Sequence, residues 1–112
     1  METDPKRDNR ISARFMALAA EFLARESIGH ALLTVTGISA SKDNKNVVIL
    51  ITVFPDKYED QALSFAKRQR SDFREYVKVK AAGLGRYPIF DFEIDLGEKN
   101  RQHIDSLIQK TK

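Results

Sequence analysis

The sequence predicts an α+β fold in which helices pack on a three-stranded sheet, in the order α-β-β-α-α-β-α. Two strand-like runs separated by a polar turn follow a helical segment near the start of the chain. A third strand-like run, with alternating apolar and acidic residues, follows a long helical region. Helices and strands in this order, without regular β-α-β alternation, are typical of the α+β class.

An apolar stripe at helical spacing predicts the first helix, and it consists of Ile11, Phe15, Leu18 and Phe22. Gly29 is a suitable stop signal, so this helix is expected over roughly residues 9–28. Residues 1–8 are polar and are expected to form a flexible N-terminus. Residues 9–110 are then expected to form a single domain.

A β-hairpin is expected next. Residues 32–40 are rich in β-branched side chains, and residues 41–46 have the composition of a turn. Residues 47–54 are apolar at both parities, so both faces of this strand should be buried in the middle of a sheet. Pro55 should end the hairpin.

The long helical region should begin at a capping box formed by Asp56 and Glu59. Its apolar pattern is interrupted, and Ser71 and Asp72 are residues that favour helix starts. We therefore expect two helices that meet at a kink near residues 70–72. Two glycines, at 83 and 85, and Pro88 should end the region.

The last strand is expected over residues 89–96. Four apolar side chains should point inward: Phe90, Phe92, Ile94 and Leu96. Three carboxylates should point outward: Asp91, Glu93 and Asp95. We interpret them as a charged strand face rather than a metal site, because alternate residues on a strand lie about 7 Å apart. Asp95 is also placed to cap a final helix at 98–110, with Ile104, Leu107 and Ile108 inward.

Composition excludes several classes of function. The chain has 112 residues, no cysteine, a net charge of +3 and a pI of about 9.3, so a polyanionic partner is favoured and thiolate chemistry is excluded. No secretory leader and no apolar run long enough to span a membrane are present, which predicts a cytoplasmic protein without a membrane partner. His30 and His103 lack recognisable catalytic partners, so no enzyme, cofactor or metal site is expected.

Basic residues gather around the interrupted helix. Between residues 67 and 86 there are seven of them, against only Asp72 and Glu75. Flexible fixed charges on one surface suit the phosphates of a nucleic-acid backbone, and a helix start near Ser71 adds amide donors. The alternative is a solvated helix exterior. The expected binding set is Lys67, Arg68, Arg70, Ser71, Arg74, Lys78, Lys80 and Arg86.

The order of elements, with a basic helix–kink–helix before the last strand, resembles a type II KH-like domain. Residues 35–43, Val-Thr-Gly-Ile-Ser-Ala-Ser-Lys-Asp, resemble the first-strand signature of the ribosome-binding factor A family. Arg10-Ile11 and the stretch from Phe73 through the aromatic last strand resemble the same family. The triplet at 70–72, Arg-Ser-Asp, stands where the family usually has Ala-x-Gly. The family also has a run of basic residues before the proline, and of this run residues 83–86 keep only Arg86.

The resemblance implies a ribosome assembly factor that binds the small (30S) ribosomal subunit and assists late maturation of 16S rRNA. Its mechanism would be binding rather than catalysis, and a monomer is expected. Two alternatives stay open: another KH-like or helix-turn-helix nucleic-acid-binding module, and a protein-interaction domain with an incidental basic face.

Overall fold

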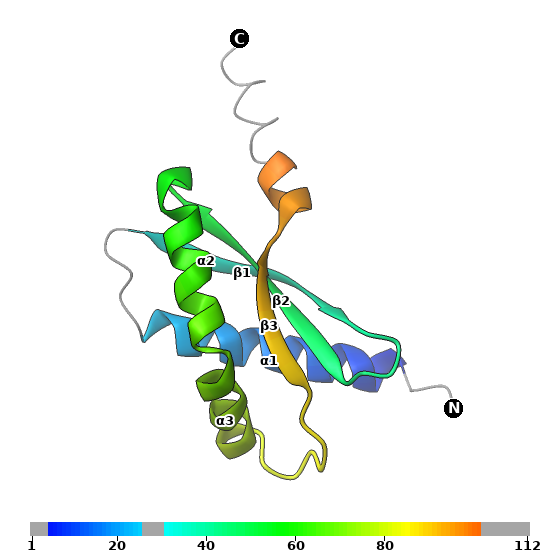
Figure 1. Ribbon diagram of the computed structural model, residues 1–112. Coiled ribbons are helices and arrows are strands. Elements are labelled where there is room, and N and C mark those ends of the chain that lie inside the picture. The colour runs from blue at the N-terminus through cyan, green and yellow to red at the C-terminus, as the bar shows by residue number, and fades with distance from the viewer. Residues whose placement is uncertain (1–4, 26–30, 102–112) are drawn as a thin grey trace.

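The computed structural model describes residues 5–25 and 31–101 (Figure 1). Its elements in chain order are α1 (Pro5–Ala24), β1 (Leu32–Ala40), β2 (Asn46–Phe54), the 3-10 helix η1 (Asp56–Tyr58), α2 (Glu59–Arg68), α3 (Arg70–Lys80), β3 (Ile89–Ile94) and a helical segment at 96–101. The expectations for Gly29, His30, His103 and the inward residues Ile104, Leu107 and Ile108 lie outside the described residues.

The sheet has the order β1-β2-β3. β1 pairs antiparallel with β2, and β3 pairs parallel with β2, so α2 and α3 form the crossover between the last two strands. β2 is therefore the central strand, as its unbroken apolar sequence predicted. The α+β class and the expected element order are confirmed.

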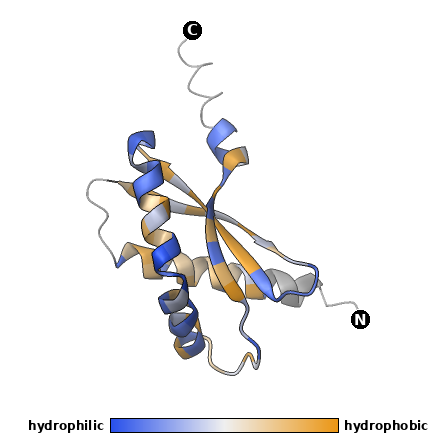
Figure 2. Cartoon of the chain, in the orientation of Figure 1, coloured by the Kyte–Doolittle hydropathy of each residue, from blue (hydrophilic) through white to orange (hydrophobic). Residues whose placement is uncertain are grey.

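The core lies on the helical side of the sheet. Alternate residues of β2 and β3 point into it, and they pack against buried residues of α1, α2 and α3 in one cluster. Phe73 of α3 is the centre, because its ring lies 4.8 Å from that of Phe90, 5.4 Å from that of Phe22 and 5.7 Å from that of Phe92. Along α2 and α3, hydrophilic residues are interspersed with hydrophobic ones (Figure 2).

The opposite face of the sheet is more open than predicted. Val48 and Leu50 are only partly buried there, although their neighbours Ile49 and Ile51 are completely buried. The expectation that both faces of the central strand are buried is therefore wrong for the middle of β2. α1, α2 and α3 all contribute to the core cluster on the other face.

A β-bulge interrupts the pairing of β1 and β2 at Thr36, between the pairs Val35–Ile51 and Gly37–Leu50. The extra residue lets both Val35 and Ile38 face the core despite their odd spacing. The Thr36 hydroxyl donates a hydrogen bond to Asp95 Oδ2 at 2.7 Å. The bulge thus ties the edge strand to the end of β3.

The hairpin turn follows from the Ser-Lys-Asp sequence. The Ser41 hydroxyl lies 2.6 Å from Asp43 Oδ1, which also accepts the Lys45 amide, and the Ser41 oxygen accepts the Asn46 amide. These bonds hold the pKa of Asp43 below its ordinary value, with the Ser41 bond the main cause. Asn44 adopts a φ of 58°, a conformation that asparagine tolerates well.

Two predicted helix starts differ from the structure. α1 begins at Pro5 rather than near residue 9, so residues 5–8 of the expected flexible terminus are helical. The expectation of a single domain over residues 9–110 stays a prediction. Asp56 and Glu59 form no capping box, because Pro55 and Tyr58 occupy the cap positions and no side-chain cap bond is present. The carboxylates instead lie in first turns, where the helix dipole favours them.

The break in the basic helical region lies at Gln69, one residue before the predicted kink at 70–72. Gln69 has φ −93° and ψ 5°, and α3 begins at Arg70 without a side-chain cap. Ser71 and Asp72 are therefore residues of the first turn and not caps. Their predicted role was wrong because the backbone turns without needing a capping side chain.

The end of β3 also differs from its predicted boundary. The strand stops at Ile94, and Leu96, expected inward, is 66% exposed in the helical segment at 96–101. The predicted cap is confirmed, since Asp95 Oδ1 accepts the Glu98 amide at 3.0 Å. Within the described part of the chain, no helix has the length and apolarity needed to cross a membrane.

Candidate nucleic-acid interface

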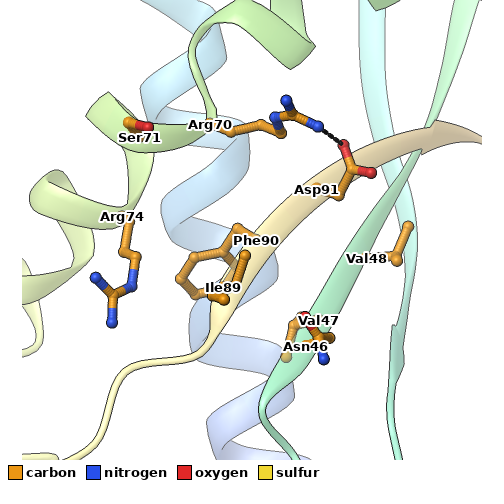
Figure 3. Close-up of a pocket in the computed structure, with 9 residues that line it drawn as sticks. All are labelled: Asn46, Val47, Val48, Arg70, Ser71, Arg74, Ile89, Phe90 and Asp91. Carbon is orange, nitrogen blue, oxygen red and sulfur yellow. Dashed lines mark hydrogen bonds and ion pairs between the residues drawn. The ribbon is translucent and has the colours of Figure 1, made fainter.

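The break between α2 and α3 faces the start of β3 across a pocket of about 480 Å³. Figure 3 shows the nine residues that line it: Asn46, Val47, Val48, Arg70, Ser71, Arg74, Ile89, Phe90 and Asp91. The two strands contribute most of the apolar lining, and the first turn of α3 contributes the arginines and Ser71. The pocket therefore combines apolar strand residues with two arginines and the Asp91 carboxylate.

Asp91 is the main counterion of the pocket. Its Oδ1 lies 3.1 Å from Lys67 Nζ and 3.2 Å from an Arg70 guanidinium nitrogen, and Lys67 also lies 2.6 Å from Glu93 Oε1. Burial opposes the charged form of Asp91, yet the Phe92 amide and these cations hold its pKa below the ordinary value. Lys67 and Arg70 are thus brought together, and both already pair with carboxylates of β3.

Arg74 holds the loop before β3. Its Nε donates to the Pro88 carbonyl and its NH2 group donates to the Tyr87 carbonyl, both at 3.0 Å. Both bonds go to backbone oxygens, and the guanidinium is partly buried. Arg74 therefore positions the start of β3 and the pocket wall, a role that the sequence did not indicate.

Lys78 and Lys80 leave α3 in different directions. Lys78 pairs with Glu75 one turn earlier at 3.1 Å, in an exposed contact of little energetic weight. Lys80 lies on the side of α3 that faces α1, with its ammonium 5.7 Å from the centre of the Tyr76 ring. The predicted binding set is therefore divided between two flanks of the helix.

Three exposed members of the predicted set differ from the others in their lack of internal partners: Arg68, Ser71 and Arg86. Their side chains make no hydrogen bond or ion pair with any described residue. Arg68 ends α2, Ser71 lies in the first turn of α3, and Arg86 follows Gly85, whose φ of +84° favours glycine. These side chains can meet a ligand without giving up an internal partner.

Two tyrosines near the basic helices, Tyr76 and Tyr87, have internal contacts. The Tyr87 hydroxyl donates to the Ala81 carbonyl at 2.8 Å and so ties the end of α3 to the loop. The Tyr76 ring packs 5.3 Å from that of Phe22, at the edge of the core. Neither ring is a free platform.

The three carboxylates of the last strand do not converge. Asp91 and Glu93 bind Lys67, whereas Asp95 turns to Thr36 and the Glu98 amide. In the described ranges, no group of three or more His, Cys, Asp or Glu side chains could hold a metal ion. The interpretation as a charged strand face fits these contacts. It did not include the pairing of Asp91 and Glu93 with the basic side chains of α2 and α3. Their outward alternation on β3 was the available signal.

A mixed three-stranded sheet with helices on one face, and a helix pair interrupted before the last strand, define a type II KH-like domain. No family model matches the chain. It is 30% identical to ribosome-binding factor A of Clostridium botulinum (strain Eklund 17B / Type B) over 83 residues, which are 73% of this chain and 72% of that protein. It is 27% identical to ribosome-binding factor A of Thermobifida fusca over 111 residues, 97% of this chain and 74% of the relative. The chain belongs to the ribosome-binding factor A family.

Solved structures of the family share the fold. The crystal structure of ribosome-binding factor A from Thermus thermophilus matches with a TM-score of 0.66 at 21% identity, covering 77% of this chain and 92% of that one. A homology model of the Thermus thermophilus protein, fitted into a cryo-EM map of its complex with the 30S subunit, matches with a TM-score of 0.65 at 21% identity and covers 75% and 90%. These likenesses extend over most of the chain and show that the fold is shared.

Proposed function

We propose that the protein is a cytoplasmic ribosome assembly factor that binds the small (30S) ribosomal subunit and assists late maturation of 16S rRNA. Family membership carries this proposal, because the relatives are named for ribosome binding and one neighbour was fitted into a 30S complex. The exposed cations around the α2–α3 break supply a matching chemistry. The protein acts by binding and not as an enzyme.

The pocket side of α3 is the proposed contact surface for rRNA. Arg68, Ser71 and Arg86 meet phosphates directly, since they have no internal partner among the described residues. Arg70 exchanges its single contact with Asp91 for a phosphate, whose oxygens can accept two parallel bonds from the guanidinium. Arg74 supports the surface through its bonds to the loop.

Binding can assist maturation by changing populations. A rigid domain that binds one rRNA conformation more tightly than another shifts the equilibrium by the difference in binding free energy. The buried aromatic cluster around Phe73 supplies that rigidity, because it fixes α3 against α1 and β3. No chemical step is needed.

A helix-turn-helix module for duplex DNA is the competing function. Such motifs join their helices by a turn of three or four residues, which separates the recognition helix from its support. Here one residue, Gln69, separates α2 from α3, and α3 buries Phe73 and Val77 in the core. This geometry favours the KH-like interpretation.

Sedimentation with purified subunits tests the proposal. The protein should pellet with 30S subunits and not with 50S subunits, and an excess of duplex DNA should not compete. The variant Arg68→Gln/Arg70→Gln/Arg86→Gln should bind more weakly, while Lys45→Gln/Lys57→Gln, which removes exposed charge from the hairpin turn and η1, should bind normally. Failure to pellet with 30S subunits at low salt would contradict the proposal.

Maturation requires its own test. Cells that lack the protein should accumulate precursor 16S rRNA, and the wild-type gene should correct this where the triple variant does not. Normal 16S rRNA processing in the deletion strain would limit the function to binding. Analytical ultracentrifugation of the free protein tests the expected monomer.

A further inference from the structure

A second strip of basic residues runs along the junction of α1 and α3, on the flank of α3 opposite the pocket. We define this α1–α3 seam by four cations, of which three belong to α1 or directly follow it: Arg10, Arg14, Arg25 and Lys80. All four residues are exposed. Residues four apart share a helix side, so Tyr76 and Lys80 face α1 while Arg70, Arg74 and Lys78 line the other flank.

Contacts to backbone and ring atoms fix three of the four seam cations. Arg14 donates from NH2 to the Lys80 carbonyl at 2.9 Å, a favourable place for a cation at the end of a helix. Arg25 Cζ lies 5.5 Å from the centre of the Tyr76 ring, and Lys80 Nζ lies 5.7 Å from the same centre. These contacts hold the three side chains in place, and none of the three forms an ion pair with a described carboxylate.

The seam is short of negative charge. Glu21 is the carboxylate beside Tyr76 and Arg25, and burial together with Glu21 raises the pKa of Tyr76. Glu75 pairs with Lys78, and Asp72 lies in the first turn of α3, so neither balances the seam. Among the described side chains, four cations therefore face one carboxylate, whereas Asp91 and Glu93 pair with Lys67 and Arg70 on the pocket side.

We propose that the α1–α3 seam is a second RNA-binding surface, which holds the phosphodiester backbone through its arginines and Lys80. The proposal rests on the proposed function and adds to it, because it places RNA along both flanks of α3. RNA carries a condensed layer of counterions, and each phosphate that a seam cation neutralises releases counterions into solution, which favours binding. Arginine suits this task, since its planar fork binds phosphate oxygens in pairs.

The test compares two variants that each lose two positive charges. The seam variant is Arg25→Gln/Lys80→Gln, which keeps Arg14 and its bond to the end of α3. The control is Lys45→Gln/Lys57→Gln, in which Lys57 likewise lies over a tyrosine ring, 5.1 Å from the centre of that of Tyr58. Affinity for purified 30S subunits is measured across a salt series, and thermal unfolding checks that each variant is folded.

The seam variant should bind more weakly, and its slope of log affinity against log salt should be shallower by about 1.4–1.8, from about 0.7–0.9 for each phosphate contact. The control should keep the wild-type slope. A second variant, Arg10→Gln, removes a side chain with no contact to a described residue, so it keeps the fold and should reduce the slope by about 0.7–0.9.

The outcomes separate this proposal from the proposed function. If the wild type fails to bind 30S subunits, the proposed function and the seam proposal are both overturned. If the wild type binds, the pocket-side triple variant is weakened, and both seam variants match the control, only the seam proposal is overturned. Weaker binding by the seam variants with an unchanged salt slope would indicate a protein contact and would also overturn it.

Discussion

Replacing Arg74 by lysine separates a structural role from an RNA-binding role at one position. The substitution keeps the positive charge but removes the planar fork, so a single ammonium cannot reproduce both bonds to the Tyr87 and Pro88 carbonyls. We expect the loop before β3 to be held less firmly, while the charge available to RNA stays the same.

The magnitude follows from the two bonds. A hydrogen bond with one charged partner contributes about 1.5–3 kcal/mol, and the partial exposure of Arg74 favours the lower end of that range. Loss of one bond should therefore reduce the free energy of unfolding by about 1–2 kcal/mol. For a chain of 112 residues, an unfolding entropy of about 2.1 cal/mol/K per residue converts this loss to a fall in Tm of about 4–8 °C.

Thermal unfolding followed by circular dichroism measures the effect, and Arg68→Lys is the matched control because Arg68 has no described partner. The control should change Tm by less than about 2 °C, since substitutions at exposed sites without contacts stay within about 0.5 kcal/mol. The salt slope for 30S binding should be the same in both variants. An unchanged Tm together with weakened subunit binding in Arg74→Lys would show that Arg74 contacts RNA instead.

Three further predictions concern the core, the cap and the pocket counterion. Phe73→Ala should lower the free energy of unfolding by about 3–5 kcal/mol in urea denaturation, because a completely buried ring is lost, and a loss under about 1 kcal/mol would contradict the packing described. The Glu98 amide and the Thr36 hydroxyl hold the pKa of Asp95 below its ordinary 3.8, so its stabilisation is present above that pH and is lost as pH falls through the lower folded value. Asp95→Ala should therefore cost about 1 kcal/mol at neutral pH and progressively less below pH 3.8, and a loss that stays constant down to about pH 2 would argue against the cap. Asp91→Asn should release Arg70 and Lys67 and tighten 30S binding, with a salt slope steeper by about 0.7–0.9; weaker binding would mean that Asp91 positions Arg70 for RNA.

The order of elements was predictable because periodicity records burial. Alternation on β3 placed Phe90 and Phe92 inward, and the continuous apolar run of β2 placed it at the centre of the sheet. These patterns repeat over several residues, so one irregular position does not hide them. The bulge at Thr36 is such an irregular position, and the one local signal for it was Gly37, a glycine in the interior of a strand.

The distribution of charge was less predictable. Sequence counts placed seven basic residues near the break, but they could not show that Asp91 and Glu93 lie beside Lys67 across the crossover. They also could not separate Lys80 from Arg70, since the flanks of α3 acquire different neighbours only when α1 and β3 pack against it. Pairing between distant segments decides which cations remain available, and local sequence does not contain that information.

The break at Gln69 explains how this chain turns without the glycine that its family usually has. Gln69 occupies the bridge region of φ/ψ space, which any residue can adopt, so no positive φ is required. Its amide bonds to the Ala66 carbonyl and its carbonyl accepts the Phe73 amide, so hydrogen bonding is almost continuous from α2 to α3. The first turn of α3 carries the side chains of Arg70 and Ser71 where a glycine would have none. Under the proposed function, RNA meets this surface mainly through long cationic side chains, and affinity that depends on them falls steeply as salt rises.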